Sequence, residues 1–148
     1  MRVVGEIGAV EGRRLLGSAG VGRALHTSRA MPAVTVLDYE VSDGVLNFVA
    51  DAGGEVAGAV RDHVIAFHVE QIDPSGENGW SVTVLGTAYL IEEPGPVGVR
   101  GHLGLHSGEV REQLFGLSLE HVSGQRLRRR TPAERAAAPD GPVGPVTA

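Results

Sequence analysis

The 148-residue chain contains neither cysteine nor lysine, so all thirteen of its basic residues are arginine. The absence of cysteine excludes a disulfide framework, a thiolate nucleophile and a zinc site with cysteine ligands. The absence of lysine excludes Schiff-base catalysis by a lysine side chain. No apolar run approaches the roughly 20 residues of a membrane-spanning helix, and the first residues lack the apolar segment of a secretion signal. We therefore expect a cytoplasmic protein that does not span a membrane.

An excess of positive charge is also absent. The formal net charge is −5, which argues against nucleic-acid binding, because proteins that bind nucleic acids normally present a basic face. The length corresponds to one domain, which we expect to span residues 1–130. Residues 131–148 hold four of the eight prolines and no periodic apolar pattern. This composition predicts a disordered tail rich in proline, alanine and glycine.

Short segments of alternating apolar and polar residues dominate the chain, which predicts a mainly β protein. The tight-turn residues Ser42–Gly44 separate two such segments and predict a β-hairpin. Gly86 and Gly116 lie inside apparent strands and are expected to mark bulges or bends. With only short helices expected at 11–18 and 54–61, the pattern favours a small β-barrel. The six expected strands are 21–27, 33–41, 45–50, 63–72, 80–93 and 112–127.

The stretch "FVADAGGEVAGAVRD" (48–62) joins a strand, a glycine-rich turn and a short helix. Free backbone N–H groups point outward at such a junction, so it is a natural seat for a phosphate. The stretch nevertheless carries three acids, Asp51, Glu55 and Asp62, against the single base Arg61. It can therefore be a phosphate cradle, a cradle that no longer binds phosphate, or a simple turn.

Three segments resemble one known family. They are "GVGRALHT" (20–27), "MPAVTVLDYEVSDGVLNFVADAGG" (31–54) and, most specifically, "AFHVEQIDPSGENGWSVTVLGTA" (66–88). Together they are similar to the short actinobacterial members of the pyridoxamine 5′-phosphate oxidase-like family, which are FMN-binding split barrels. The resemblance covers about residues 15–127. It implies a six-stranded split β-barrel and a homodimer with the flavin between subunits. A barrel this small would also expose apolar strand faces as a monomer.

The resemblance also assigns positions to the flavin phosphate. The family's Arg-Thr pair falls on Val49 and Ala50, and its Ser-Lys pair falls on Gly54 and Glu55. Every charged or hydroxyl ligand is thus replaced, and Glu55 reverses the sign. Because a charge pair about 4 Å apart is worth on the order of 4 kcal/mol at an effective dielectric of about 20, FMN binding should be much weakened. Arg61 could substitute only from the far end of the helix.

Two further arginines are conceivable substitutes. Arg23 or Arg100 could reach the phosphate from the partner chain of a dimer, although both also read as ordinary surface arginines.

The catalytic candidates are Asp38, Tyr39 and His68. Asp38 is an acid on an otherwise apolar strand face, although it also reads as an exposed edge acid. Asp38 and Tyr39 occupy positions where the family often carries an Asn-Tyr or Asn-His pair near the flavin ring. His68 is either a catalyst or a histidine of the barrel wall or interface. The candidate cofactor-binding residues are Thr35, Val49, Ala50, Gly54, Glu55, Arg61 and Trp80, of which Trp80 also reads as a core or interface aromatic.

Two further patterns have simpler readings. His102 and His106 are spaced as on one helix face but lie in a loop rich in glycine and proline, so we predict no metal site. The cluster "RLRRR" (126–130) is either a solvated strand end or a surface that binds an acidic partner.

Two functions follow, and the sequence leaves open whether the protein is an enzyme. The first is a flavin-dependent oxidoreductase that acts on a small organic substrate, with FMN supplying the reactivity. The second is a flavin-free split barrel that binds a small apolar metabolite and cyclises or isomerises it, a role that would suit bacterial secondary metabolism. The charges at the phosphate corner, formed by the positions assigned to the flavin phosphate, distinguish the two.

Overall fold

The computed structural model describes residues 1–92 and 112–137, and within them nine strands form one antiparallel sheet. The order across the sheet is β1-β9-β6-β5-β2-β3-β4-β8-β7. The strands are β1 (Arg2–Ile7), β2 (Val21–Ser28), β3 (Met31–Ser42), β4 (Val45–Asp51), β5 (Val64–Ile72), β6 (Asn78–Thr87), β7 (Tyr89–Leu90), β8 (Glu112–Ser118) and β9 (His121–Arg128). The helices are α1 (Ala9–Leu16), α2 (Glu55–Val60) and α4 (Pro132–Ala136).

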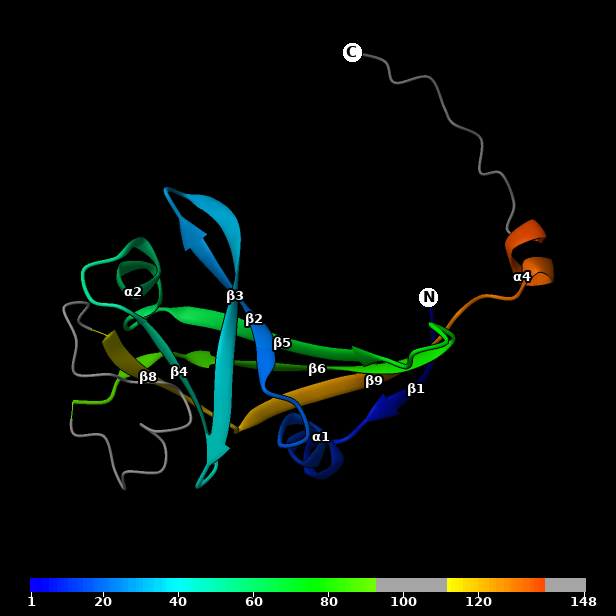
Figure 1. Cartoon of the computed structure of the whole chain (residues 1–148), viewed down its shortest axis with the longest axis horizontal. Coiled ribbons are helices and arrows are strands. Elements are labelled where there is room, and N and C mark those ends of the chain that lie inside the picture. The colour runs from blue at the N-terminus through cyan, green and yellow to red at the C-terminus, as the bar shows by residue number, and fades with distance from the viewer. Residues whose placement is uncertain (93–111, 138–148) are drawn as a thin grey trace, which may run out of the picture.

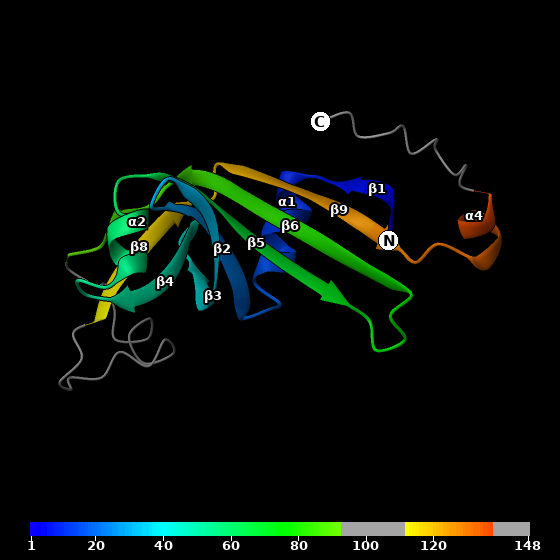
Figure 2. The ribbon, with the colours of Figure 1, turned by 90° about the horizontal axis from the view of Figure 1, so that it is seen from above.

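The sheet curls at one end and stays open at the other (Figures 1 and 2). The long strands β5, β6 and β9 run from the curled end, beside α2, toward an open end that carries β1 and α4. At the curled end β6 packs against β8, although the two strands are not neighbours in the sheet. Gly86 permits this approach, because a Cβ atom there would lie 3.1 Å from Cδ1 of Leu117. The predicted split barrel is confirmed. The β5–β6 register runs through Gly86 without a bulge, so this glycine serves the close approach of β8 and does not mark the predicted bulge.

The predicted number of six strands is wrong. β1 was missed because only Ile7 at its end is buried, so its sequence carries no alternating pattern. The pattern at 80–93 divides into β6 and the two-residue β7. The pattern at 112–127 divides into β8 and β9, which are joined by a turn at Leu119 and Glu120 but pair with different strands, β8 with β4 and β9 with β6. Neither turn residue is glycine, proline, asparagine or aspartate, so the usual turn signal is missing.

Gly116 does not mark a bend. It lies in the middle of β8, opposite Asn47 of β4 and Tyr89 of β7. A Cβ atom at this position would lie 2.6 Å from Cζ of Tyr89. The glycine therefore makes room for an aromatic ring across the sheet.

All three phenylalanines of the chain meet in the core. Phe48 stacks on Phe115 with ring centroids 5.6 Å apart and lies 5.7 Å from Phe67. All three side chains are fully buried. Helix α1 covers the same inner face further along β9, where a Cβ atom on Gly12 would lie 2.8 Å from Cγ1 of Val122. The inner face of the sheet is thus filled by the chain itself.

The chain continues in order past the predicted domain boundary at residue 130. Thr131 caps α4 with a capping box, since its side chain accepts a bond from the Glu134 N–H and Glu134 accepts one from the Thr131 N–H. Residues 131–137 therefore differ from the predicted disordered tail, and a local capping signal, T-P-A-E, explains the difference. The remainder of that tail, 138–148, lies outside the described residues, as do His102 and His106.

No helix in the described ranges combines the length and the apolar character needed to cross a membrane.

A chain that ends after Arg130 should melt within about 2 °C of the full chain, because α4 buries no residue and exposed ion pairs contribute little. Thermal denaturation followed by circular dichroism, at matched pH and salt, measures this. A decrease of several degrees would mean that the C-terminal residues pack on the sheet.

Candidate functional site

The glycine-rich corner between β4 and α2 is a tight turn. The Gly54 N–H donates to the Asp51 carbonyl over 2.9 Å, and Gly53 adopts a φ of +75° at the third turn position, where glycine is favoured. A Cβ atom on Gly54 would lie 3.0 Å from the same carbonyl oxygen. Val49 is half-buried and Ala50 is buried. The strand–turn–helix backbone is thus present as predicted, without side-chain donors from these positions.

Glu55 opens α2 and has a partner within the chain. The hydroxyl of Ser28, at the end of β2, donates to Oε1 of Glu55. An acid in the first turn of a helix is also favoured by the helix dipole. Beside this pair is an open groove of about 460 Å³. The groove is lined by Thr27, Ser28, Arg29, Glu55, Gly58, Ala59 and His63.

Two cationic or titratable side chains in this groove were not predicted. Arg29 lies in the β2–β3 turn, where it adopts a left-handed φ of 50°. His63 donates from Nδ1 to the Arg61 carbonyl over 2.8 Å. The β2–β3 turn was expected from the sequence. That it lies beside α2 and lines the same groove follows only from the three-dimensional structure. Arg61 does not line the groove, and its Nε lies 3.8 Å from the carboxylate of the adjacent Asp62.

The charges of this corner do not fit a phosphate dianion. Arg29 supplies one positive charge and Glu55 supplies one negative charge in the same groove. The Ser28 hydroxyl is already donated to Glu55. A phosphate here would meet a carboxylate at close range, and this repulsion costs affinity.

The outer face of β3 is apolar and uncovered. Val34 and Val36 are 61% and 62% exposed, and Asp38 follows them on the same face. Their partners on β2 are Leu25, Arg23 and Val21, respectively. Val21 is 54% exposed and Leu25 is 41% exposed. Asp38 therefore stands at the edge of an exposed apolar surface, as the sequence predicted.

Tyr39 points to the opposite face from Asp38. Its hydroxyl donates to the Leu16 carbonyl over 2.6 Å, and its ring meets the Phe67 ring edge-on with centroids 5.3 Å apart. Burial raises the pKa of Tyr39 to about 12. The side chain therefore joins β3 to α1 and is not available to a ligand on the outer face.

Thr35 likewise faces inward. Its hydroxyl lies 2.9 Å from Nε2 of His26, a histidine that is only 8% exposed. Thr35 and Asp38 therefore lie on opposite faces of β3.

A polar chain of four side chains crosses the outer face beside Val36. Nδ1 of His68 lies 3.0 Å from the Thr83 hydroxyl, and Nε2 of His68 lies 3.5 Å from Oε2 of Glu70. Arg23 donates to Oε1 of Glu70 over 2.9 Å. Arg23 was considered only as a phosphate ligand from a partner chain, and Glu70 was not predicted. Their alternate spacing with Leu25 and His68 along β2 and β5 could have placed both on this face. His68 and Asp38 therefore share one face.

Trp80 is separate from both regions. It is half-buried on the inner face of β6, where it packs against the core, and its partners across the sheet are Gln71 and Arg126. It borders a groove of about 500 Å³ toward the open end. The core reading of Trp80 therefore matches its position.

Over residues 1–92 and 112–137, no three histidine, aspartate or glutamate side chains are grouped closely enough to hold a metal ion.

Comparison with known proteins identifies relatives of this fold. The model of a family described as pyridoxamine 5′-phosphate oxidase matches residues 10–126. An uncharacterised protein of Mycobacterium tuberculosis is 34% identical over 63% of this chain, and the match spans 64% of that relative's length.

Two solved structures share the fold over most of the chain. An FAD-binding protein of Mycobacterium smegmatis is 21% identical, with a TM-score of 0.66, over 84% of this chain and 98% of its own. An FAD-binding protein of Mesorhizobium loti is 23% identical, with a TM-score of 0.68, over 86% and 99%.

Replacing Tyr39 with phenylalanine should lower the free energy of unfolding by about 1–3 kcal/mol, because the buried Leu16 carbonyl loses its donor. Denaturant unfolding measures this, and binding of a ligand to the outer face should not change. Unchanged stability together with weakened ligand binding would instead give Tyr39 a direct role in the site.

Proposed function

Because the chain belongs to the pyridoxamine 5′-phosphate oxidase family, we propose that it binds a flavin and acts as an oxidoreductase on a small organic substrate. The observation that carries the proposal is the exposed apolar surface of Val34 and Val36, bordered by Asp38. A planar ring system buries apolar area on such a surface, which is the main source of affinity for aromatic ligands. The two FAD-binding proteins that share the fold support the same ligand class.

Polar groups at the border of this surface suit the edge of a flavin ring. The carboxylates of Asp38 and Glu70 can accept hydrogen bonds, whereas Arg23 can donate them. The imidazole of His68 can donate or accept a hydrogen bond on the same face. We assign Asp38 and His68 to the substrate side of the site. A bound flavin would supply the redox chemistry itself.

The phosphate contributes little in this proposal. Val49, Ala50 and Gly54 offer no side-chain donor, and Glu55 opposes an anion. Affinity therefore arises from the ring system, and FMN has no advantage over riboflavin.

We further propose that two copies of the chain form the cleft. A sheet face that exposes Val21, Val34, Val36 and Leu85, each at 50% or more, is unusual for a monomer. A second copy would cover this face and would close a cleft around a planar ligand. The Arg23–Glu70–His68 chain would then border the cleft.

One observation favours a second candidate function. Glu55, at the phosphate corner, already accepts a hydrogen bond from the Ser28 hydroxyl. The polar groups of the corner are therefore paired with each other without a bound cofactor. A flavin-free barrel would use the same outer face to bind a small apolar metabolite without a phosphate group. Asp38 and His68 would then catalyse its cyclisation or isomerisation by proton transfer.

The dimer is tested by mass in solution. Light scattering at micromolar concentration should give about twice the chain mass of 15.4 kDa. Val36→Asp should shift the mass toward the monomer, because it places a charge on the covered face. Val10→Asp is the matched control, since Val10 is 84% exposed on α1 and should leave the dimer intact. A monomeric wild-type protein would exclude a two-chain cleft.

Flavin binding is tested by comparing two ligands. The protein as isolated should carry little flavin, and FMN and riboflavin should bind about equally, with dissociation constants of about 100 μM to 1 mM. Val49→Arg with Glu55→Lys should strengthen FMN binding at least about tenfold and leave riboflavin unchanged. Glu77→Lys is the control, because it makes the same charge reversal at a residue that does not line the groove. Gly54 is kept, because a side chain there would press on the Asp51 carbonyl.

The two functions give different results in this experiment. Stoichiometric FMN in the isolated protein would contradict the minor role of the phosphate. A dimer that binds neither flavin at about 1 mM would reject the flavin proposal and favour the flavin-free barrel.

A further inference from the structure

The open end of the sheet, which carries β1 and α4, lies away from the curled end beside α2 (Figure 1). This open end is rich in arginine. Arg128 ends β9, and Arg2 lies directly opposite it on β1. Arg129 and Arg130 follow β9, and both are exposed. This end contains most of the cluster that the sequence singled out and that the proposed function does not use.

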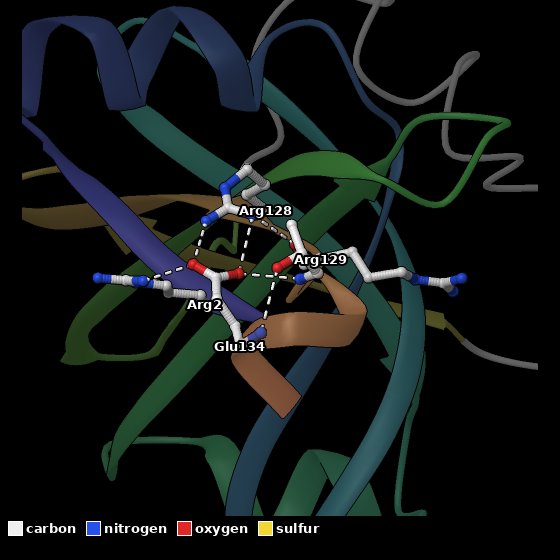
Figure 3. A network of polar contacts seen from close by, with 5 residues as sticks. Arg2, Arg128, Arg129 and Glu134 are labelled. Atoms are coloured by element: carbon white, nitrogen blue, oxygen red, sulfur yellow. Dashed lines mark hydrogen bonds and ion pairs between the residues drawn. The ribbon is translucent and has the colours of Figure 1, made fainter. Parts of the chain in front are cut away.

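A single carboxylate occupies the centre of this arginine cluster (Figure 3). Oε1 of Glu134 accepts from Nη1 of Arg2 over 2.7 Å and from Nη2 of Arg128 over 2.8 Å. Oε2 accepts from Nη1 of Arg128 over 3.1 Å and from the Thr131 N–H over 2.8 Å. Arg128 thus makes a bidentate contact, the geometry in which arginine recognises carboxylates most strongly. The hydrogen bond from Arg128 is the main reason that the pKa of Glu134 is lowered to about 2.

Little else attaches the helix that delivers this carboxylate. α4 has five residues and buries none of them. Its capping box, in which Glu134 also takes part, stabilises the helix internally. The position of α4 on the sheet therefore depends on the contacts of Glu134 with Arg2 and Arg128.

We propose that Arg2 and Arg128 form a docking site for an acidic segment of a partner protein, and that α4 occupies this site in the isolated chain. The occupant is itself a carboxylate presented by a short peptide segment, so the site is already shaped for that chemistry. Arg129 and Arg130 extend the positive surface and would contact further acidic side chains of the segment. A nucleic acid suits the site less well, because the chain as a whole carries a net charge of −5. The partner segment competes with α4 for the two arginines, and α4 therefore weakens its binding.

The test measures binding of fluorescein-labelled octaglutamate by fluorescence anisotropy at low ionic strength, with octaglutamine as the uncharged probe. Glu134→Gln should bind octaglutamate about threefold to tenfold more tightly than the wild type, because the internal competitor is removed. Glu77→Gln changes the net charge equally at the same end of the sheet and should have less than about a twofold effect. Octaglutamine should not bind.

A second pair of variants identifies the arginines. Adding Arg128→Gln to Glu134→Gln should abolish the gain, because the bidentate partner is lost. Adding Arg14→Gln, which removes a charge on α1 instead, should preserve it. The chain is full length in every case, and α4 is peripheral, so folding is not at risk.

Three results would overturn the proposal. Equal effects of Glu134→Gln and Glu77→Gln on octaglutamate binding would show that net charge, and not a specific site, controls the affinity. No binding of octaglutamate to Glu134→Gln up to about 1 mM would show that the two arginines do not form a docking site. Tighter binding of a DNA duplex than of octaglutamate at equal salt would assign the surface to nucleic acid instead.

Discussion

A β-strand has two faces, and in β2 and β3 the chain supplies apolar side chains to both but covers only one. Phe48, Phe67 and Phe115 fill the inner face together with α1. Val34 and Val36 point the other way and remain exposed. Because exposed apolar area is costly in water, we propose that a ligand, a second copy, or both cover the outer face. The proposed site and the proposed dimer depend on this single constraint.

At the phosphate corner, the backbone geometry of a phosphate-binding junction is present without the side chains that would bind a phosphate. The turn at Asp51–Gly54 keeps the tight geometry of a strand–turn–helix junction. The charge at this junction does not suit a phosphate, because Glu55 repels an anion and already accepts a hydrogen bond from Ser28. A family relationship therefore fixes the barrel and the junction here without fixing the ligand group that the junction receives. In the proposed function, the outer face receives the flavin ring and the corner contributes little.

Alternation and turn residues were enough to predict much of the fold. The hairpin at Ser42–Gly44 and the two faces of β3 follow from these signals alone. β1 and the turn at Leu119 could not be predicted in this way, because one lacks a buried face and the other lacks a turn residue.

The site was predicted less completely than the fold. Alternation correctly separated Asp38 from Tyr39, but assigning chemistry to both ignored that separation. The position of Arg29 needed the three-dimensional structure, because the groove that it lines also takes residues from α2. The central claim, that a planar ligand binds the outer face of β3, is tested most directly by NMR of valine methyl groups during titration with riboflavin. The account predicts shifts and ring-to-methyl contacts at Val34 and Val36, with Val82 and Val84 of the core unchanged. Shifts at the core valines with none at Val34 and Val36 would contradict it.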